Sequence, residues 1–437
     1  MEQSYRDLGY WVCASFQHLR PFSLNAENID EFEVTMLSGD LALFLNALRG
    51  RGVLKEGELV RIAKAQKIGS HRLKTSIVPT LSKLRSDRIV VTSGKQLFLE
   101  EHLDSAAHLY DVVGQVWEML EPSLVERAAI YVLQHTFVMP RMQSEEIALL
   151  NKSGLGDEDA EEGLGVAKSF RIIQPFSGKG LDEPILFNPY IWRANQHKIA
   201  RAVSQLPPGE KKAVENTLES VAKWQALPLG AVRIGDDLLA TAHSVGLIDL
   251  VEVNTGTGDK KNFVFTPHLT THPDVTRLAD DLLNDVRAVL ACVSYGEHYS
   301  RISRLGGSGR EKTINTLRKL LRMGEAGDAT AIGVDYSLLE ERGIIIAKPT
   351  STPPGGRYSM ELLREEPVRI ALRVIEDSVR SASPAPLFVH TKNLDPATLF
   401  ASPEQTRVAA APSLGTQPLQ VKEARNHFLK KIRKEVF

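Results

Sequence analysis

Apolar and polar residues alternate at helical spacing in two consecutive stretches, which flank the sequence Ile68-Gly69-Ser70. In the first stretch, Glu56–Lys67, the apolar positions that share one face are Leu59, Ile62 and Ala63. In the second stretch the apolar positions follow at intervals of four, four and three residues, at Leu73, Ile77, Leu81 and Leu84. Gly69 can adopt a positive φ, so the pattern predicts two helices joined by a tight turn. Pro79 lies inside the second stretch and predicts a kink or a late start of that helix.

A β-hairpin is predicted directly after the second helix. Ile89-Val90-Val91 and Leu97-Phe98-Leu99 are short apolar runs, and Thr92–Lys95 between them has the composition of a turn. Two helices followed by a hairpin resemble the winged helix-turn-helix superfamily, in which the second helix enters the major groove of DNA and the hairpin is the wing. The resemblance implies DNA binding. A solvated basic helix face beside an ordinary three-helix core is the alternative.

Residues 51–95 carry a strong local excess of positive charge. They contain eleven Lys or Arg and three acids, a balance of +8 in a chain whose formal net charge is −1. Such an excess on a helix-turn-helix pattern indicates a phosphate partner. The residues of this region that we expect to contact DNA are Arg61, Lys64, Arg72, Lys74, Thr75, Lys83, Arg85 and, on the wing, Lys95.

The order of helices followed by a hairpin occurs four times, at intervals of roughly 80–100 residues. The predicted hairpins are Ile89–Leu99, Arg171–Phe187, Leu247–Phe265 and Gly343–Met360. Because each interval has the size of a small domain, we predict an α+β, mainly α, tandem array of four winged-helix modules. Each module would have a small two-stranded wing, and no large sheet would be shared between them.

The pattern divides the chain into seven parts. These are an N-terminal arm (1–33), module one (34–105), module two (106–200), module three (201–273), module four (274–380), a linker (381–418) and a basic C-terminal helix (419–437). The arm is rich in aromatic residues and is expected to pack either on this chain or on a second copy, which would form a homodimer. The linker contains six prolines.

The four modules differ in charge. Module two has five basic and nine acidic residues over 141–190, and module three has six basic and seven acidic residues over 211–270. In module four, residues 301–322 contain seven Lys or Arg and one acid. Its predicted recognition helix is Arg310–Met323, with DNA contacts from Arg310, Lys312, Asn315, Arg318, Lys319 and Arg322. The acidic helix Tyr336–Glu341 is the alternative recognition helix; the basic helix would then lie across the DNA backbone.

Composition and length fit a globular chain of several domains. The apolar fraction is 43%, the charged fraction is 24%, and the pI is near 6.9, so nucleic-acid contacts must come from local patches. No apolar run reaches the roughly 18–20 residues of a membrane helix, and no signal peptide is predicted. Two cysteines favour a reducing compartment. We therefore expect a cytoplasmic, nucleoid-associated protein in a bacterium or a nuclear protein in a eukaryote.

Motifs for catalysis or cofactor binding do not stand out. His268 and His272 have the spacing of a zinc pair but lack the accompanying glutamate, so exposed loop histidines are expected. Gly306–Thr313 resembles a phosphate-binding loop, yet Glu311 stands where that motif requires glycine. We expect neither an enzyme nor a cofactor or metal site.

Two functions from different classes fit these patterns. The first is binding of double-stranded DNA by modules one and four together, as a transcriptional regulator or a replication or partition factor, with the middle modules setting the spacing. The second is a winged-helix assembly or scaffold protein that binds protein partners through its acidic middle modules and its C-terminal helix. The basic clusters favour DNA, and the neutral pI favours assembly.

Overall fold

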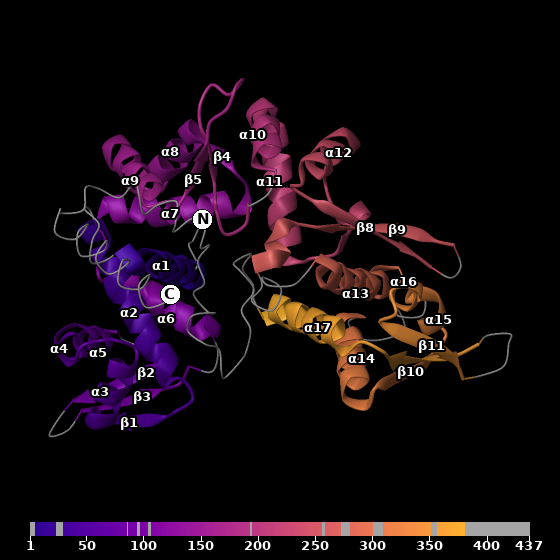
Figure 1. Cartoon of the computed structure of the whole chain (residues 1–437), viewed down its shortest axis with the longest axis horizontal. Helices are drawn as coiled ribbons and strands as arrows, with labels where there is room; N and C mark the ends of the chain where they lie inside the picture. Colours follow the sequence, from indigo (N-terminus) through magenta and orange to yellow (C-terminus); the bar gives the residue numbers. More distant parts are fainter. Residues whose placement is uncertain are drawn as a thin grey trace, which may run out of the picture. The chain divides into compact units, whose positions relative to one another are not determined.

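We describe the protein from a computed structural model, in which the chain forms two compact units (Figure 1). The first unit extends through Tyr190, and the second begins at Ile191. Both are mainly helical with small three-stranded antiparallel sheets, which confirms the predicted mainly α, α+β class. The structure describes residues 5–22, 29–84, 86–93, 97–103, 106–192, 195–255, 258–271, 280–299, 309–350 and 356–380. None of the helices in these ranges combines the length and the apolar content that a membrane span requires.

The first unit contains modules one and two, which repeat one order of elements. In module one a helix, a short strand, two helical segments and a hairpin follow each other as α2 (Glu33–Leu48), β1 (Val53–Lys55), α3 (Glu56–Ala65), α4 (Ser70–Arg72) continued by η3 (Leu73–Ile77) and α5 (Val78–Lys83), β2 (Ile89–Ser93) and β3 (Leu97–Glu101). Module two has the same order in α7 (Leu124–Val138), β4 (Arg141–Met142), α8 (Gln143–Lys152), α9 (Asp157–Ser169), β5 (Gln174–Phe176) and β6 (Ile185–Phe187). The remaining elements are α1 (Tyr5–Leu19), η1 (Arg20–Phe22), η2 (Ile29–Phe32) and α6 (Ala106–Met119).

The second unit repeats this order in modules three and four. Module three contains α11 (Pro208–Lys223), β7 (Leu227–Pro228), η4 (Leu229–Ala231), α12 (Asp236–Val245), β8 (Asp249–Asn254) and β9 (Lys260–Phe265). Module four contains α14 (Gly309–Met323), β10 (Glu325–Ala329), α15 (Ile332–Asp335), α16 (Ser337–Glu341), β11 (Ile345–Pro349) and β12 (Tyr358–Leu362). The other described elements are α10 (Gln196–Gln205), η5 (Pro267–Thr271), α13 (Asp280–His298) and α17 (Glu365–Arg380).

All four predicted hairpins are present, and each is joined by a third strand that was not predicted. In every sheet the last strand lies in the middle, with the orders β1-β3-β2, β4-β6-β5, β7-β9-β8 and β10-β12-β11. In module one, Val53 lies opposite Glu100 and Lys55 lies opposite Phe98. The predicted two-stranded wings are therefore three-stranded sheets.

The helices that precede three of the hairpins also end alike. A residue with positive φ follows the helix, at Arg171 (55°), Gly246 (85°) and Gly343 (62°). The next backbone N–H donates to a carbonyl five residues earlier, with 2.9 Å from Ile172 to Ala167, from Leu247 to Ala242 and from Ile344 to Leu339. Each of these aliphatic residues is buried, which fixes where the chain enters the hairpin.

The N-terminal helix α1 belongs to the core of the first unit. It packs against α6, α2 and α7, and Trp11 and Phe16 are buried there. A Cβ at Gly9 would lie 2.0 Å from the carbonyl oxygen of Tyr110, and one at Gly114 would lie 2.0 Å from that of Tyr5. The backbones of α1 and α6 therefore touch. The predicted arm packs on this chain, and its buried aromatic residues do not form a surface for a second copy.

Modules three and four share one hydrophobic core. Val253 and Phe263 of module three lie in the same buried cluster as residues of α13, α14, α17 and the module-four sheet. Side chains outside module three hold its hairpin: Tyr295 Oη donates to Asp259 Oδ2 at 3.1 Å, Arg287 Nη2 donates to Asp249 Oδ2 at 2.9 Å, and Ser337 Oγ donates to the Asn254 carbonyl at 2.5 Å. The sheets of modules three and four are therefore joined through one buried cluster.

In module four the basic helix lies before the first strand of the sheet and not directly before the hairpin. Residues of the predicted recognition helix Arg310–Met323 form α14, which precedes strand β10 and takes the place that α2 and α7 have in the first unit. The segment directly before the hairpin is α16, which corresponds to the alternative Tyr336–Glu341. The order of elements thus places the acidic helix, and not the basic one, next to the hairpin in sequence.

Candidate nucleic-acid interface

Helix α3 of module one begins at the predicted residue and buries the predicted apolar side. The backbone N–H of Lys55 donates to Glu58 Oε2 at 3.1 Å, which satisfies one N–H at the start of the helix. Leu59, Ile62 and Ala63 are buried against the module. Because those three residues occupy the inner face, Arg61 and Lys64 are exposed.

In the turn after α3, the positive φ predicted for Gly69 is found at Lys67 instead. Lys67 has the positive φ (63°), whereas Gly69 has an extended conformation with φ −65° and ψ 145°. Ile68 is buried, and its N–H donates to the Ala63 carbonyl at 2.9 Å. The buried Ile68 determines the path of the chain, so the left-handed conformation falls on the residue before it, which is a lysine.

The second helix of module one is distorted where Pro79 predicts a kink. Val78 N–H donates to the Leu73 carbonyl, five residues earlier, so Leu73–Ile77 form one turn of π-helix between α4 and α5. Pro79 has no N–H to donate to Thr75 and its ring displaces that carbonyl, which accounts for the wider turn. Thr75 Oγ1 donates to the His71 carbonyl at 3.0 Å. The predicted apolar face is present, because Leu73, Ile77, Leu81 and Leu84 are buried.

Two of the candidate DNA-binding cations form ion pairs within module one. Arg72 Nε lies 2.7 Å from Asp40 Oδ2 of α2, and Lys74 Nζ lies 2.6 Å from Glu56 Oε1 of α3. Burial raises the pKa of Asp40, while Arg72 acts in the opposite direction. The Lys74–Glu56 pair is exposed on both sides, and such pairs contribute about 0.2–1 kcal/mol, so a phosphate group can replace the Glu56 carboxylate.

The structure describes six of the eight candidates in module one. Arg61, Lys64, Arg72, Lys74, Thr75 and Lys83 are all exposed, whereas Arg85 and Lys95 lie outside the described residues. Within the described ranges, no ion pair joins Arg61, Lys64 or Lys83 to an acid. Sequence analysis did not identify the acidic partners Asp40 and Glu56, because nothing in the spacing relates residues that are 32 or 18 positions apart.

The candidates of module four lie on one helix but outside the position that precedes a hairpin. Lys312, Asn315, Arg318, Lys319 and Arg322 are exposed on α14; Arg310 lies in the helix, and its side chain is outside the described part. Arg318 Nη2 lies 2.6 Å from Glu376 Oε1 of α17. The structure thus places the described candidates on the surface of the second unit, on a helix that lies before the first strand of the sheet.

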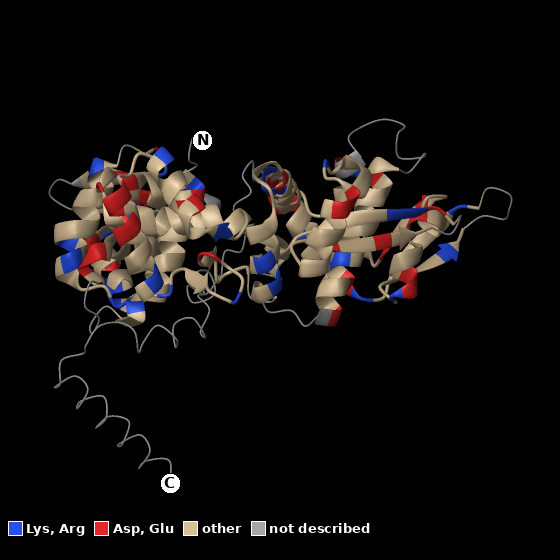
Figure 2. Cartoon of the chain, turned by 90° about the horizontal axis from the view of Figure 1, so that it is seen from above, with Lys and Arg blue, Asp and Glu red and all other residues tan. Residues whose placement is uncertain are grey.

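The helices directly before the other hairpins do not present basic faces. In α9 the exposed residues include Asp157, Glu158, Glu161 and Glu162, and α12 has Asp236 and Asp237 and no Lys or Arg. In α16, Leu339 is buried, and the helix contacts α13 and β8 of the same unit. Figure 2 shows Lys and Arg interspersed with Asp and Glu along the described parts of both units.

The histidine predicted to be exposed in a loop is buried. His268 is 4% exposed, its ring lies edge-on to Trp192 with 5.6 Å between centroids, and its Nδ1 lies 3.0 Å from Thr266 Oγ1. His272 lies outside the described residues. In the described ranges, no group of three or more His, Cys, Asp or Glu side chains is arranged to hold a metal ion.

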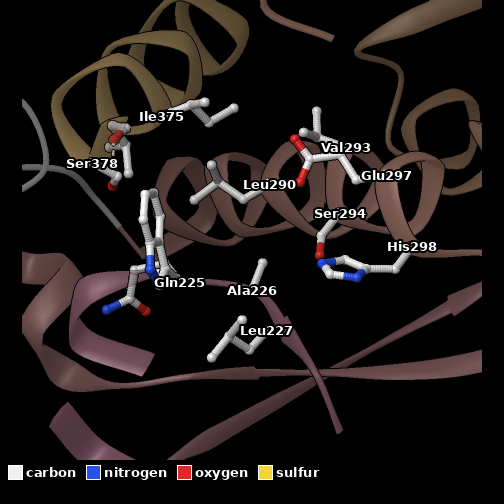
Figure 3. A pocket seen from close by; sticks show the side chains of 12 residues that line it. Gln225, Ala226, Leu227, Leu290, Val293, Ser294, Glu297, His298, Ile375 and Ser378 are labelled. Carbon is white, nitrogen blue, oxygen red and sulfur yellow. Dashed lines mark hydrogen bonds between the residues drawn. The ribbon is translucent and has the colours of Figure 1, made fainter. Parts of the chain in front are cut away.

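A pocket in the second unit lies between β7, α13 and α17 (Figure 3). Its wall is mostly apolar, with Leu227, Leu290 and Ile375 around it, and Glu297 and His298 come from the end of α13. Its lining contains one carboxylate and no Lys or Arg. We therefore assign the pocket no part in binding a phosphate backbone.

Comparison of the chain with protein-family models, curated proteins and solved structures gives no match. The functional assignment therefore rests on the geometry and charge of the chain itself.

Proposed function

We propose that the chain is a double-stranded DNA-binding protein and that module one makes the base-reading contact. The observation that carries this proposal is the contrast among the four helical segments that precede a hairpin. The α4–η3–α5 segment exposes Arg72, Lys74 and Lys83, whereas α9, α12 and α16 are acidic or lack basic residues. A regulator of transcription and a replication or partition factor would both use such a surface.

The order of elements supports an assignment of each module as a winged helix. Each has a helix, a short strand, two helical segments and a hairpin, and the first strand pairs with the last. In the winged helix-turn-helix superfamily the helix before the hairpin enters the major groove. By that resemblance α4–η3–α5 would contact base edges, and the β2–β3 hairpin would contact the adjacent backbone.

The exposed polar residues of module one fall into two groups, candidates for phosphate contacts and candidates for base-edge contacts. Lys64 and Lys83 are free to contact phosphates, which fix the register of a protein on the duplex. Lys74 lies on the same helical segment as Thr75, and both side chains are exposed, so they are our candidates for base-edge contacts. On binding, DNA would replace Glu56 as the partner of Lys74 and Asp40 as the partner of Arg72.

The test is a salt titration of duplex binding by the full chain, measured by fluorescence anisotropy with a random-sequence duplex. Each phosphate contact contributes a slope of roughly 0.9 to the fall of log K with log salt. Replacing Lys64 and Lys83 by alanine should therefore weaken binding and reduce the slope by roughly 1.8. Both residues are exposed, so the variant is expected to fold normally.

A matched control removes two exposed lysines from module two. Lys152→Ala with Lys179→Ala lowers the net charge by the same amount, and this variant should keep the affinity and slope of the original chain. If the module-one variant and the control behave alike, module one is not the DNA-binding surface. If the original chain binds no duplex even at low salt, the DNA-binding proposal itself is wrong.

One specific observation favours the second candidate, protein assembly. Val53 and Val90 are 58% and 43% exposed, and they lie on either side of Glu100 in neighbouring strands of the module-one sheet. A protein partner would cover both valines, although Glu100 between them keeps them from forming one continuous apolar patch. Assembly is therefore the function that we would adopt if the duplex titration gave no binding.

A further inference from the structure

Helix α14 presents a continuous basic stripe on the surface of the second unit. Its inner side is buried through Ile314, Leu317 and Leu320, and it packs against α13, α17 and β10. The outer side contains the exposed residues Lys312, Asn315, Lys319 and Arg322. Their spacing of three, four and three residues places them within an arc of roughly 80° over roughly 15 Å of helix.

The local acids leave this stripe positively charged. Glu311 is the one acid of α14 and lies in its first turn. Glu376 of α17 is paired with Arg318, which lies beside the stripe. Among the described residues, no ion pair joins Lys319 or Arg322 to a carboxylate. The C-terminal half of the stripe therefore has two cations that are available to an external anion.

The position of α14 limits what this anion can be. The helix precedes β10, and the place before the hairpin is taken by α16, which contacts α13 and, through Ser337, the module-three strand β8. Helix α14 therefore does not occupy the position directly before the β11–β12 hairpin, which is the position of a groove-reading helix in the winged helix-turn-helix superfamily. A row of cations along its exposed side fits a regularly spaced chain of phosphates, which is contacted without reading bases.

We propose that the outer side of α14 is a second DNA-contact surface, which binds phosphates without sequence preference while module one selects the sequence. This inference rests on the proposed DNA-binding function and assigns it a second site. The two units belong to one chain, so binding by one raises the effective concentration of the other at the same duplex. The α14 surface would then strengthen binding to every sequence by the same factor.

The experiment uses the full chain with Lys319→Ala and Arg322→Ala together. The loss of two phosphate contacts should reduce the salt slope by roughly 1.8 and weaken binding about tenfold or more near 0.1 M salt. Selection from a randomised duplex library should enrich the same motif with this variant as with the original chain. The variant Lys74→Ala with Thr75→Ala should instead change the enriched motif.

Two controls separate the position of the charges from their number. Lys198→Ala with Arg201→Ala removes two exposed cations from α10 in the same unit and should leave affinity and slope unchanged. Lys319→Arg with Arg322→Lys keeps both charges and should retain binding. A steep slope that persists in the α14 alanine variant would overturn this inference while leaving module one as the DNA-binding site. Absence of duplex binding by the original chain would instead overturn the proposed function.

Discussion

The carboxyl group of Glu126 gives the first unit a pH-dependent stability that can be calculated from its surroundings. Glu126 is 2% exposed at the start of α7, and its Oε1 accepts a hydrogen bond of 2.5 Å from the backbone N–H of Thr35 in α2. Burial raises the pKa of Glu126 to about 7, although the hydrogen bonds from Thr35 act in the opposite direction. The group therefore links the first helices of modules one and two.

The direction of the effect follows from the proton balance. The pKa of Glu126 is about 7 in the folded chain and 4.5 for an ordinary glutamate, so the folded state binds more protons between these values. The free energy of unfolding then falls as the pH rises from about 4.5 through about 7. The shift corresponds to a loss of about 3 kcal/mol once the carboxylate is fully ionised.

Glu126→Gln tests this reasoning, because a neutral amide oxygen can still accept the hydrogen bond from Thr35. The variant should have nearly the stability of the original chain at pH 4.5 and exceed it by about 3 kcal/mol at pH 8. Hydrogen exchange of the peptides that cover α2 and α7 measures this locally, since multidomain chains rarely unfold in one step. A difference between the two proteins that is the same at both pH values would refute the assignment. Glu158→Gln, on the exposed side of α9, is the control.

Two further predictions concern the backbone. Gly9→Ala places a methyl group against the Tyr110 carbonyl, so α1 and α6 must separate, which should lower the free energy of unfolding by about 3 kcal/mol. Gly165→Ala lies on α9, where nothing is within 4 Å of the new methyl group, and should raise the free energy of unfolding by about 0.5–1 kcal/mol. Thermal unfolding should rank the two in this order; equal melting temperatures would contradict the close helix contact. Lys67→Gly should stabilise module one by about 1 kcal/mol, because glycine adopts a positive φ without steric cost. A lower urea midpoint for Lys67→Gly would show that this conformation is not strained.

The hairpins could be predicted from the sequence, but the strands that complete each sheet could not. A hairpin is encoded locally, by β-branched runs on both sides of a turn such as Thr92–Lys95. The first strand of each module has two to five residues and pairs with a strand far along the chain. Val53–Lys55 has no alternation long enough to distinguish it from a loop. Its strand conformation is evident only from its pairing with Phe98 and Glu100.

The candidate site was predictable in its charge and less so in its geometry. Helical periodicity correctly separated the buried and exposed sides of α3 and of the second helix, because burial of apolar residues determines both. The periodicity could not show that Arg72 and Lys74 form ion pairs with Asp40 and Glu56, since these pairs depend on tertiary packing. Nor could charge alone show which helix of module four lies directly before the hairpin, because a basic exposed side is compatible with any position in the module.

Repetition of one order of elements has therefore not produced four equivalent surfaces. In module two the segment before the hairpin is acidic, and in module four it is a short helix that packs on module three. The expectation of two equivalent recognition helices on one duplex depended on α14 lying before a hairpin, and α14 precedes the first strand instead. A chain with one reading helix and a separate phosphate-binding helix would select a single short motif. It would gain additional affinity from the flanking backbone whatever the flanking sequence.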